Sequence, residues 1–170
     1  TKVGDLIGNQ SQIGPQPFSS FGDYKKYETL STGGITLENS LFIGDFHSVA
    51  NDSLEVVMNE SILSLSNERD KVSHGLGLYA PHVSATCVGT FLQGHGMDGW
   101  HVEANNSELN SSSTQILNNG EDGLEWLGTL TWQSDLDHID SNEGFGALIG
   151  TDLQMHSNDL SVTENGLSGI

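Results

Sequence analysis

Three stretches of the chain share one pattern: "NNGEDGL" at residues 118–124, "SNEGFGAL" at residues 141–148 and "TENGLSGI" at residues 163–170. Each places an Asn four positions before a Gly that precedes an apolar residue. A glycine column continues towards the N-terminus with spacings of 24, 24, 23 and 23: Gly75, Gly99, Gly123, Gly146 and Gly169. An apolar column keeps the same step: Leu92, Ile116, Ile139 and Val162. Self-similarity at this period is typical of a solenoid of stacked repeats.

Within each repeat, apolar and polar residues alternate. Residues 100–102 read Trp-His-Val, and residues 124–126 read Leu-Glu-Trp. A period of two is that of β-strands with one buried face. One repeat cannot bury its apolar face alone, but stacked repeats can, with equivalent strands paired in parallel about 4.8 Å apart. The sequence therefore predicts an all-β parallel β-helix (solenoid) with coils of about 22–24 residues, each holding three short strands.

A polar column marks one corner of these coils: His95, Asn119, Asn142 and Asn165. In a stacked solenoid the asparagines lie above one another, so their amides can hydrogen bond from coil to coil. Asn also tolerates the left-handed backbone conformation that a tight corner requires. We therefore expect a structural corner ladder in which His95 takes the place of an Asn.

The repeat predicts the organisation of the chain. Residues 33–170 form the coils, with residues 35–37, 54–56 and 76–78 aligned at steps of 19 and 22. Residues 1–32 do not repeat, and we expect them to form an N-terminal cap or connector. A new coil begins at the last residues, so we expect the native chain to continue beyond residue 170.

The composition excludes several kinds of partner. Lys and Arg total 5 against 23 Asp and Glu, which gives a formal net charge of -18. Such a charge repels phosphate backbones and anionic lipid, so we expect neither nucleic-acid binding nor membrane insertion. No segment is long and apolar enough to span a bilayer, and no signal peptide is visible. A single cysteine, Cys87, excludes an intrachain disulfide and any cysteine-based metal site.

The corners at residues 118–124, 141–148 and 163–170 resemble those of the right-handed parallel β-helix superfamily, which includes pectate lyases, polygalacturonases, alginate epimerases and phage tailspikes. With its coils rich in Asn, Ser and Gly, the chain looks most like a bacteriophage tailspike or tail-fibre receptor-binding protein. That resemblance implies a homotrimer, on a virion tail or extracellular, that binds and sometimes degrades cell-surface polysaccharide. The alternatives are a secreted polysaccharide lyase, hydrolase or epimerase, and a noncatalytic adhesin or structural spacer.

The catalytic motifs of two members are incomplete here. Gly94-His95-Gly96 matches an element of polygalacturonases, but the Asn-Thr-Asp, Asp-Asp and Arg-Ile-Lys elements of that family are absent. Pectate lyases use an Arg base with carboxylate-bound calcium, and the single Arg of this chain, Arg69, has no evident partner set. The missing polygalacturonase elements, together with the place of His95 in the column of Asn119, Asn142 and Asn165, favour a corner role for His95. The incomplete motifs leave open whether the protein is an enzyme.

The outward column of the first strand offers one candidate for catalysis. If the register holds, His101 and Glu125 are stacked neighbours within hydrogen-bonding reach. Such a pair on an open face could transfer protons. The alternative is a solvated cross-strand pair with no chemistry.

Candidate glycan-binding residues lie on the other strands. Glu108 and His138 are expected to point outward, whereas Trp132 is either a sugar platform or part of the core. No cofactor is predicted. A structural divalent cation such as calcium stays open, because oxygen donors gather without the spacing of a known binding loop: Asp135, Asp137, Asp140 and Asn142.

Overall fold

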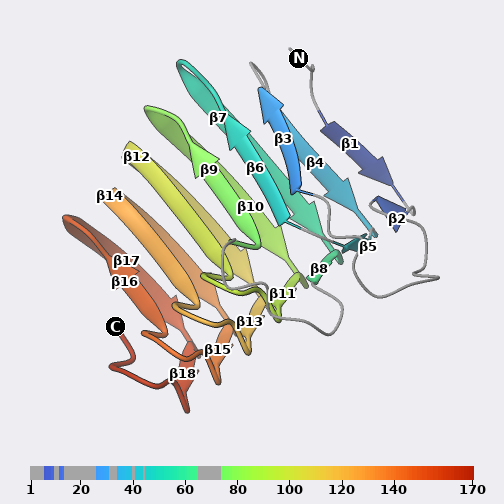
Figure 1. The fold of residues 1–170 in the computed structure, drawn as a ribbon. Helices are drawn as coiled ribbons and strands as arrows, with labels where there is room; N and C mark the ends of the chain where they lie inside the picture. The colour runs from blue at the N-terminus through green and yellow to red at the C-terminus, as the bar shows by residue number, and fades with distance from the viewer. Residues whose placement is uncertain are drawn as a thin grey trace.

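The computed structural model describes residues 6–9, 12–13, 26–30, 34–39, 41–43, 45–64 and 74–170. Within these residues every regular element is a β-strand, and the strands stack into a parallel β-solenoid of about five turns (Figure 1). This confirms the predicted fold class. No helix in the described part of the chain could cross a membrane.

The strands form three stacks, which we call the first, second and third ladders. The first contains β3 (Lys26–Leu30), β6 (Asp45–Val49), β9 (Leu76–Tyr79), the first parts of β12 (Trp100–Ser112) and β14 (Leu124–Asp135), and β16 (Ala147–Ile149). The second contains β1 (Leu6–Asn9), β4 (Gly34–Glu38), β7 (Ser53–Asn59), β10 (His82–Val88), the second parts of β12 and β14, and β17 (Asp152–Asn158). The third contains β2 (Gln12–Ile13), β5 (Leu41–Ile43), β8 (Ile62–Ser64), β11 (Phe91–Gln93), β13 (Gln115–Leu117), β15 (His138–Asp140) and β18 (Ser161–Thr163).

The register follows the sequence repeat from β9 onward. Trp100 pairs with Leu124, 24 residues later, and Thr129 pairs with Asp152, 23 residues later. Both spacings of the glycine column therefore recur in the strands. β12 and β14 each pass from the first ladder into the second, with an irregularity between Glu103 and Asn106 of β12. The difference between the two spacings is absorbed at this bulge.

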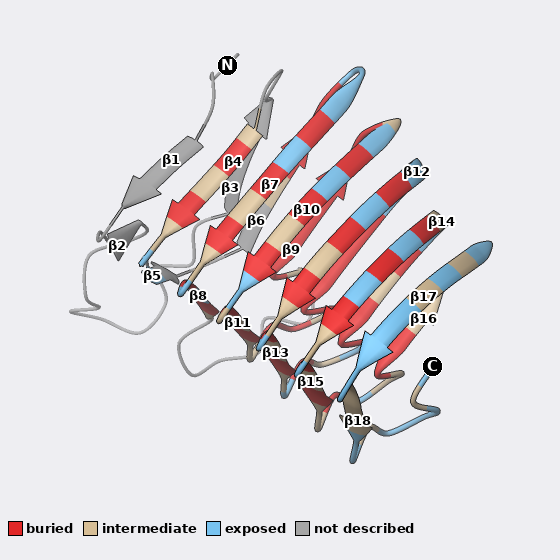
Figure 2. Ribbon diagram, turned by 180° about the vertical axis from the view of Figure 1, so that it is seen from behind, coloured by how far each residue is buried: buried red, intermediate tan, exposed pale blue. Residues whose placement is uncertain are grey.

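The inside of the coils forms the core. Burial alternates along the strands of the second ladder (Figure 2), as period-two patterning requires. The indoles of Trp100 and Trp126 are fully buried, with ring centroids 5.5 Å apart. The predicted apolar column is also inside, since Leu92, Ile116 and Ile139 are at most 4 % exposed. Each coil thus buries its apolar residues against its neighbours.

The alignment predicted for the early coils is wrong. Leu54 pairs with Val83 in the second ladder instead of Leu76, which pairs with Phe46 in the first. Ile35 pairs with Val56 instead of Leu54. The larger error arises because the chain between β8 and β9 is longer than that between β11 and β12, and most of it is residues 65–73. These residues, and Arg69 among them, lie outside the described part.

The N-terminal segment contributes strands to the same ladders. β1, β2 and β3 pair in parallel with β4, β5 and β6. Residues 26–30 are therefore a strand. Whether residues 1–32 act as a cap stays a prediction, because most of them lie outside the described residues.

The asparagine column forms the predicted ladder. The Asn119 side chain donates from Nδ2 to Oδ1 of Asn142 at 2.8 Å, and Asn142 donates in the same way to Asn165 at 2.8 Å. The backbone N–H of Asn119 also donates to Asn142 Oδ1 at 3.0 Å. Each amide therefore joins two coils at a buried corner, where an unpaired polar group would be costly.

His95 occupies the same column and makes equivalent bonds. Its backbone N–H donates to Asn119 Oδ1 at 3.1 Å, and its Nε2 lies 3.3 Å from the carbonyl oxygen of Leu63. Asn142 Nδ2 makes the matching contact with the carbonyl oxygen of Ile116, also at 3.3 Å. His95 is fully buried, so its ring extends the ladder by one coil.

The left-handed corner residues are not the ladder residues, contrary to our expectation. Positive φ angles of 52° to 74° occur one position earlier: Gly94, Asn118, Ser141 and Glu164. The ladder residue needs its own N–H to meet the next amide, so the preceding residue takes the strained conformation.

Candidate functional site

Aromatic and acidic side chains gather on the outer surface of the first ladder. We call this group the histidine cluster, and its members are His47, His74, Tyr79, Asp98, His101, Glu103 and Glu125. The register places His101 directly beside Glu125, as the sequence predicted. His74 and Asp98 come from the corners that lead into β9 and β12. The cluster therefore spans consecutive coils.

His101 lies at the centre of the cluster. Its Nδ1 is 2.5 Å from Glu125 Oε2 and 3.3 Å from Asp98 Oδ2, and its Nε2 is 3.3 Å from Glu103 Oε1. The sequence suggested a pair on an open face, but His101 is only 7 % exposed. The ring of His74 stacks on it at a centroid distance of 4.2 Å and covers it.

The electrostatics of the cluster favour a charged His101. Burial opposes the imidazolium, but hydrogen bonds to Asp98 and Glu103 and the charge of Glu125 raise the pKa of His101 to about 9. Burial would also raise the pKa of Asp98, but the adjacent nitrogens of His101 and His74 hold it far below its usual value. At neutral pH the centre is therefore an imidazolium between carboxylates.

The pKa values of two outer groups of the cluster, Glu125 and Tyr79, are raised, unlike that of Asp98. Burial, and then the charge of Asp98, raise the pKa of Glu125 in spite of the opposing charge of His101. Burial, followed by the charge of Glu103, raises the pKa of Tyr79. Glu125 is therefore easier to protonate than an isolated glutamate, which suits a group that exchanges protons.

Three members of the cluster also have the arrangement of metal ligands. The donor atoms of His74, Asp98 and His101 all lie within 4.8 Å of one another. Neither His74 nor Asp98 was predicted to bind a metal from the sequence, which left open only a structural cation at Asp135, Asp137, Asp140 and Asn142. A signal was present, since His74 and Asp98 immediately precede glycines of the repeat column, one repeat apart.

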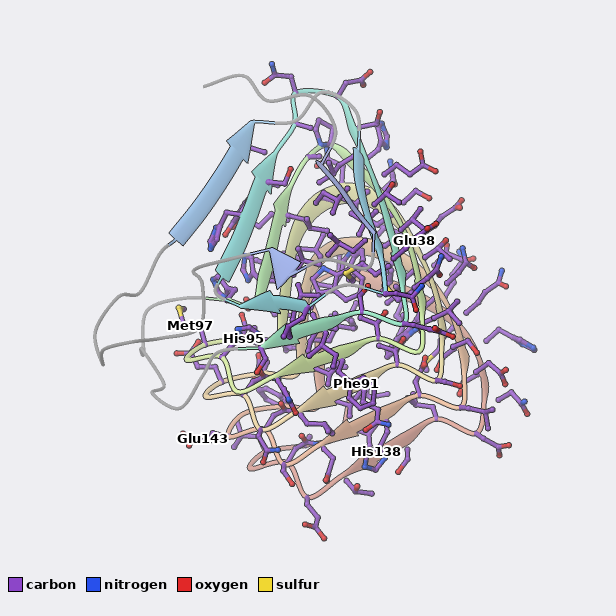
Figure 3. All side chains as sticks on the ribbon, turned by 90° about the vertical axis from the view of Figure 1, so that its right-hand side faces the viewer. Glu38, Phe91, His95, Met97, His138 and Glu143 are labelled. Carbon is purple, nitrogen blue, oxygen red and sulfur yellow. The ribbon has the colours of Figure 1, made fainter. Side chains whose placement is uncertain are left out.

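The predicted glycan-binding residues do not form one site. Glu108 is exposed on the second ladder, beside Thr131. His138 lies on the third ladder, on the same face as Phe91 (Figure 3), with 40 % of its side chain exposed. Trp132 is 2 % exposed, and its Nε1 donates to Ser111 Oγ at 2.8 Å. Its ring has no open face on which a sugar could stack. Of the two positions that the sequence allowed for Trp132, sugar platform or core, it takes the one in the core.

The oxygen donors considered for calcium are used elsewhere. Asp137 is buried and accepts hydrogen bonds from Ser134 Oγ at 2.6 Å and from the Thr114 N–H at 2.9 Å. Asn142 belongs to the corner ladder, and Asp135 accepts from Asn158. Asp137 follows Leu136, which has the left-handed backbone conformation at this corner. The direction of the Asp137 side chain therefore could not be predicted from strand alternation. Among the described residues, Asp135, Asp137 and Asp140 do not form a group with carboxylate oxygens all within 4.8 Å of one another.

Two grooves cross the outer surface beside the cluster. The face groove runs over β7, β10, β12 and β14, and its polar lining includes Glu55, His82, Ser84, Asn106, Glu108 and Thr131. The corner groove lies where the first ladder passes into the second, and its lining includes Glu103, Asn105, Thr129 and Thr151. The two grooves share Thr129. Through Glu103, the corner groove reaches the histidine cluster.

Fold and surface together define a parallel β-helix protein with polar grooves across its coils and a histidine cluster at their side. Comparisons with protein-family models, with curated proteins and with solved structures find no match to this chain. Membership of the pectate-lyase-like superfamily and likeness to tailspikes are therefore proposals.

Proposed function

We propose that this protein is a receptor-binding module of the tailspike or tail-fibre type, which binds a cell-surface polysaccharide in the face groove and corner groove. The observation that carries the proposal is the lining of these grooves with hydroxyl, amide and carboxylate groups across successive coils. A polyhydroxylated chain needs such donors and acceptors, placed on a rigid frame. Parallel ladders supply that frame, because equivalent side chains recur in each coil.

The charge of the grooves narrows the class of glycan. Glu55, Glu103 and Glu108 line them, and the whole chain carries a formal net charge of -18. An acidic polysaccharide would be repelled by this field. The proposed ligand is therefore a neutral polysaccharide or one that contains amino sugars.

The proposed assembly is a homotrimer on a virion tail or in the extracellular space. Its support is the resemblance of the Asn-, Ser- and Gly-rich coils to tailspikes. Sedimentation equilibrium measures the mass directly. A trimer that resists detergent supports the tailspike class, whereas a monomer without glycan affinity supports a structural spacer.

A second candidate function is cleavage of the same polysaccharide. The 2.5 Å contact of His101 with Glu125 favours it, because one group could donate a proton while the other accepts one. Glu103 links this pair to the corner groove. Incubation with a bound glycan separates the outcomes. New reducing ends without unsaturated sugars indicate a hydrolase, and no new ends indicate binding alone. Unsaturated ends indicate a lyase, which requires uronic acids and would therefore contradict the proposed neutral or amino-sugar ligand.

Calorimetry with neutral, amino-sugar and acidic polysaccharides tests the binding proposal. Thr131→Arg would place a long side chain in the face groove, and Gln154→Arg is the matched control, since Gln154 is the exposed neighbour of Thr131 outside that groove. We expect Thr131→Arg to weaken binding by about tenfold or more, about 1.4 kcal/mol, and the control to leave it unchanged. Equal affinity of the two variants, or preference for acidic glycans, would contradict the proposal.

A further inference from the structure

We propose that the histidine cluster binds one divalent transition-metal ion, such as Zn²⁺, through His74 Nδ1, Asp98 Oδ2 and His101 Nδ1, with the Nδ1 proton of His101 released to solvent on binding. This site goes beyond the proposed glycan function and does not depend on it.

The distances between the donor atoms are close to those around a bound ion. His74 Nδ1 lies 2.8 Å from Asp98 Oδ2, and His101 Nδ1 lies 3.3 Å from the same oxygen. Bonds of about 2.0–2.2 Å to a tetrahedral ion would separate neighbouring ligand atoms by about 3.3–3.6 Å. Small outward rotations of the side chains would therefore open the space for an ion.

The donor atoms select the class of metal. Two imidazole nitrogens with a carboxylate oxygen suit Zn²⁺ and its neighbours in the first transition row. Calcium and magnesium take oxygen ligands almost alone, so they fit this set poorly. No thiolate is involved, since the single cysteine, Cys87, is buried in the core.

His74 contributes a donor from the corner that precedes β9. Its side chain is 12 % exposed, and its Nδ1 lies 2.8 Å from Asp98 Oδ2. An ion bound between the two groups would be held by this nitrogen and this carboxylate at the same time.

The surrounding structure orients the ligands. Asp98 Oδ1 accepts the backbone N–H of Asp122 at 2.9 Å, which leaves Oδ2 directed towards the histidines. His101 Nε2 faces Glu103 Oε1, so a carboxylate holds the ring from the far side, as is usual for histidines that bind metals. His101 and Glu125 are also fixed in register on adjacent strands. The site is thus built on the frame of the solenoid.

Titration calorimetry with ZnCl₂ on protein dialysed against a chelator tests the proposal. We expect one ion for each chain, and His74→Ala and Asp98→Asn should each weaken binding by at least tenfold. His138→Ala is the matched control, because His138 also faces a carboxylate, Asp140, at 3.7 Å, but on another face. Circular dichroism of each variant shows whether the coils remain intact.

Cobalt(II) gives a second readout that needs no variant. Bound tetrahedrally by nitrogen and oxygen, Co²⁺ should give intense visible absorption that one equivalent of Zn²⁺ removes. Absence of stoichiometric Zn²⁺ binding, or an equal loss in His138→Ala and His74→Ala, would overturn the proposal. Glycan binding measured with and without chelator is a separate result, so failure of either proposal leaves the other testable.

Discussion

Replacement of Asn142 by alanine is the sharpest test of the corner ladder. Its side chain accepts from the Asn119 N–H at 3.0 Å and from Asn119 Nδ2 at 2.8 Å, and it donates to Asn165 Oδ1 at 2.8 Å and to the Ile116 carbonyl at 3.3 Å. The residue is 2 % exposed, so its partners lose bonds that water replaces poorly. At about 1 kcal/mol for each of these bonds, Asn142→Ala should lower the free energy of unfolding by about 3–4 kcal/mol.

The matched control is Asn158→Ala. Asn158 also bonds to the equivalent position of the preceding coil, Asp135 Oδ1 at 2.8 Å, but it lies on the exposed surface, so its loss should cost about 0.5 kcal/mol or less. Urea denaturation followed by circular dichroism and by tryptophan fluorescence measures both variants. Hydrogen exchange should also show faster exchange of the Asn119 amide in Asn142→Ala. If the two variants unfold at the same urea concentration, the ladder does not stabilise the coils as we argue.

Three further predictions concern other parts of the molecule. In metal-free protein, the pKa of His101 is about 9, against 6.5 in a free chain, so its protonation should contribute about 2–3 kcal/mol of stability below pH 6.5 that is lost as the pH rises to 9. The urea concentration at the unfolding midpoint should therefore fall across this range. If it falls equally in His101→Gln, protonation of His101 is not the cause. Gly128→Ala should destabilise the fold by more than about 3 kcal/mol, a large effect for a point substitution. The reason is that φ is 128° and the new Cβ would lie 1.6 Å from the Ala104 carbonyl oxygen. Gly150→Ala, whose Cβ would come no closer than 3.2 Å to another atom, is its control in thermal melts, and similar melting temperatures would contradict the steric argument. His95→Asn should keep the ladder and lower stability by about 1 kcal/mol or less, while His95→Leu should cost more in the same melts; the reverse order would refute the ladder role of the ring.

The part of the fold that follows from the sequence is the part with an uninterrupted repeat. From residue 76 onward, glycine spacing and period-two patterning predict the strand register, including the pairing of His101 with Glu125. They also predict the burial of Trp100 and Trp126. These features depend only on which residues recur at equal steps, so they can be read without coordinates.

The features that escaped prediction depend on side chains at corners. A longer connection changes the number of residues between equivalent positions of two coils, but it does not change the alternation of apolar and polar residues within the strands. For that reason Leu54 was aligned with Leu76, a residue of another ladder, whereas it pairs with Val83. His101 was taken to be solvated because it points outward, yet the rings of His74 and Tyr79 cover it. Corner side chains obey no simple period, so the contact of His74 with Asp98 needed a three-dimensional structure.

The additional chain between β8 and β9 has a consequence for how such a molecule can change over evolutionary time. The step from Phe46 to Leu76 is longer than the next step, from Leu76 to Trp100, and yet all three residues remain in one ladder. Corners can therefore gain or lose length one at a time while the hydrogen-bonded frame persists. A lineage could change the length of one corner without altering the strand pairing of the coils on either side.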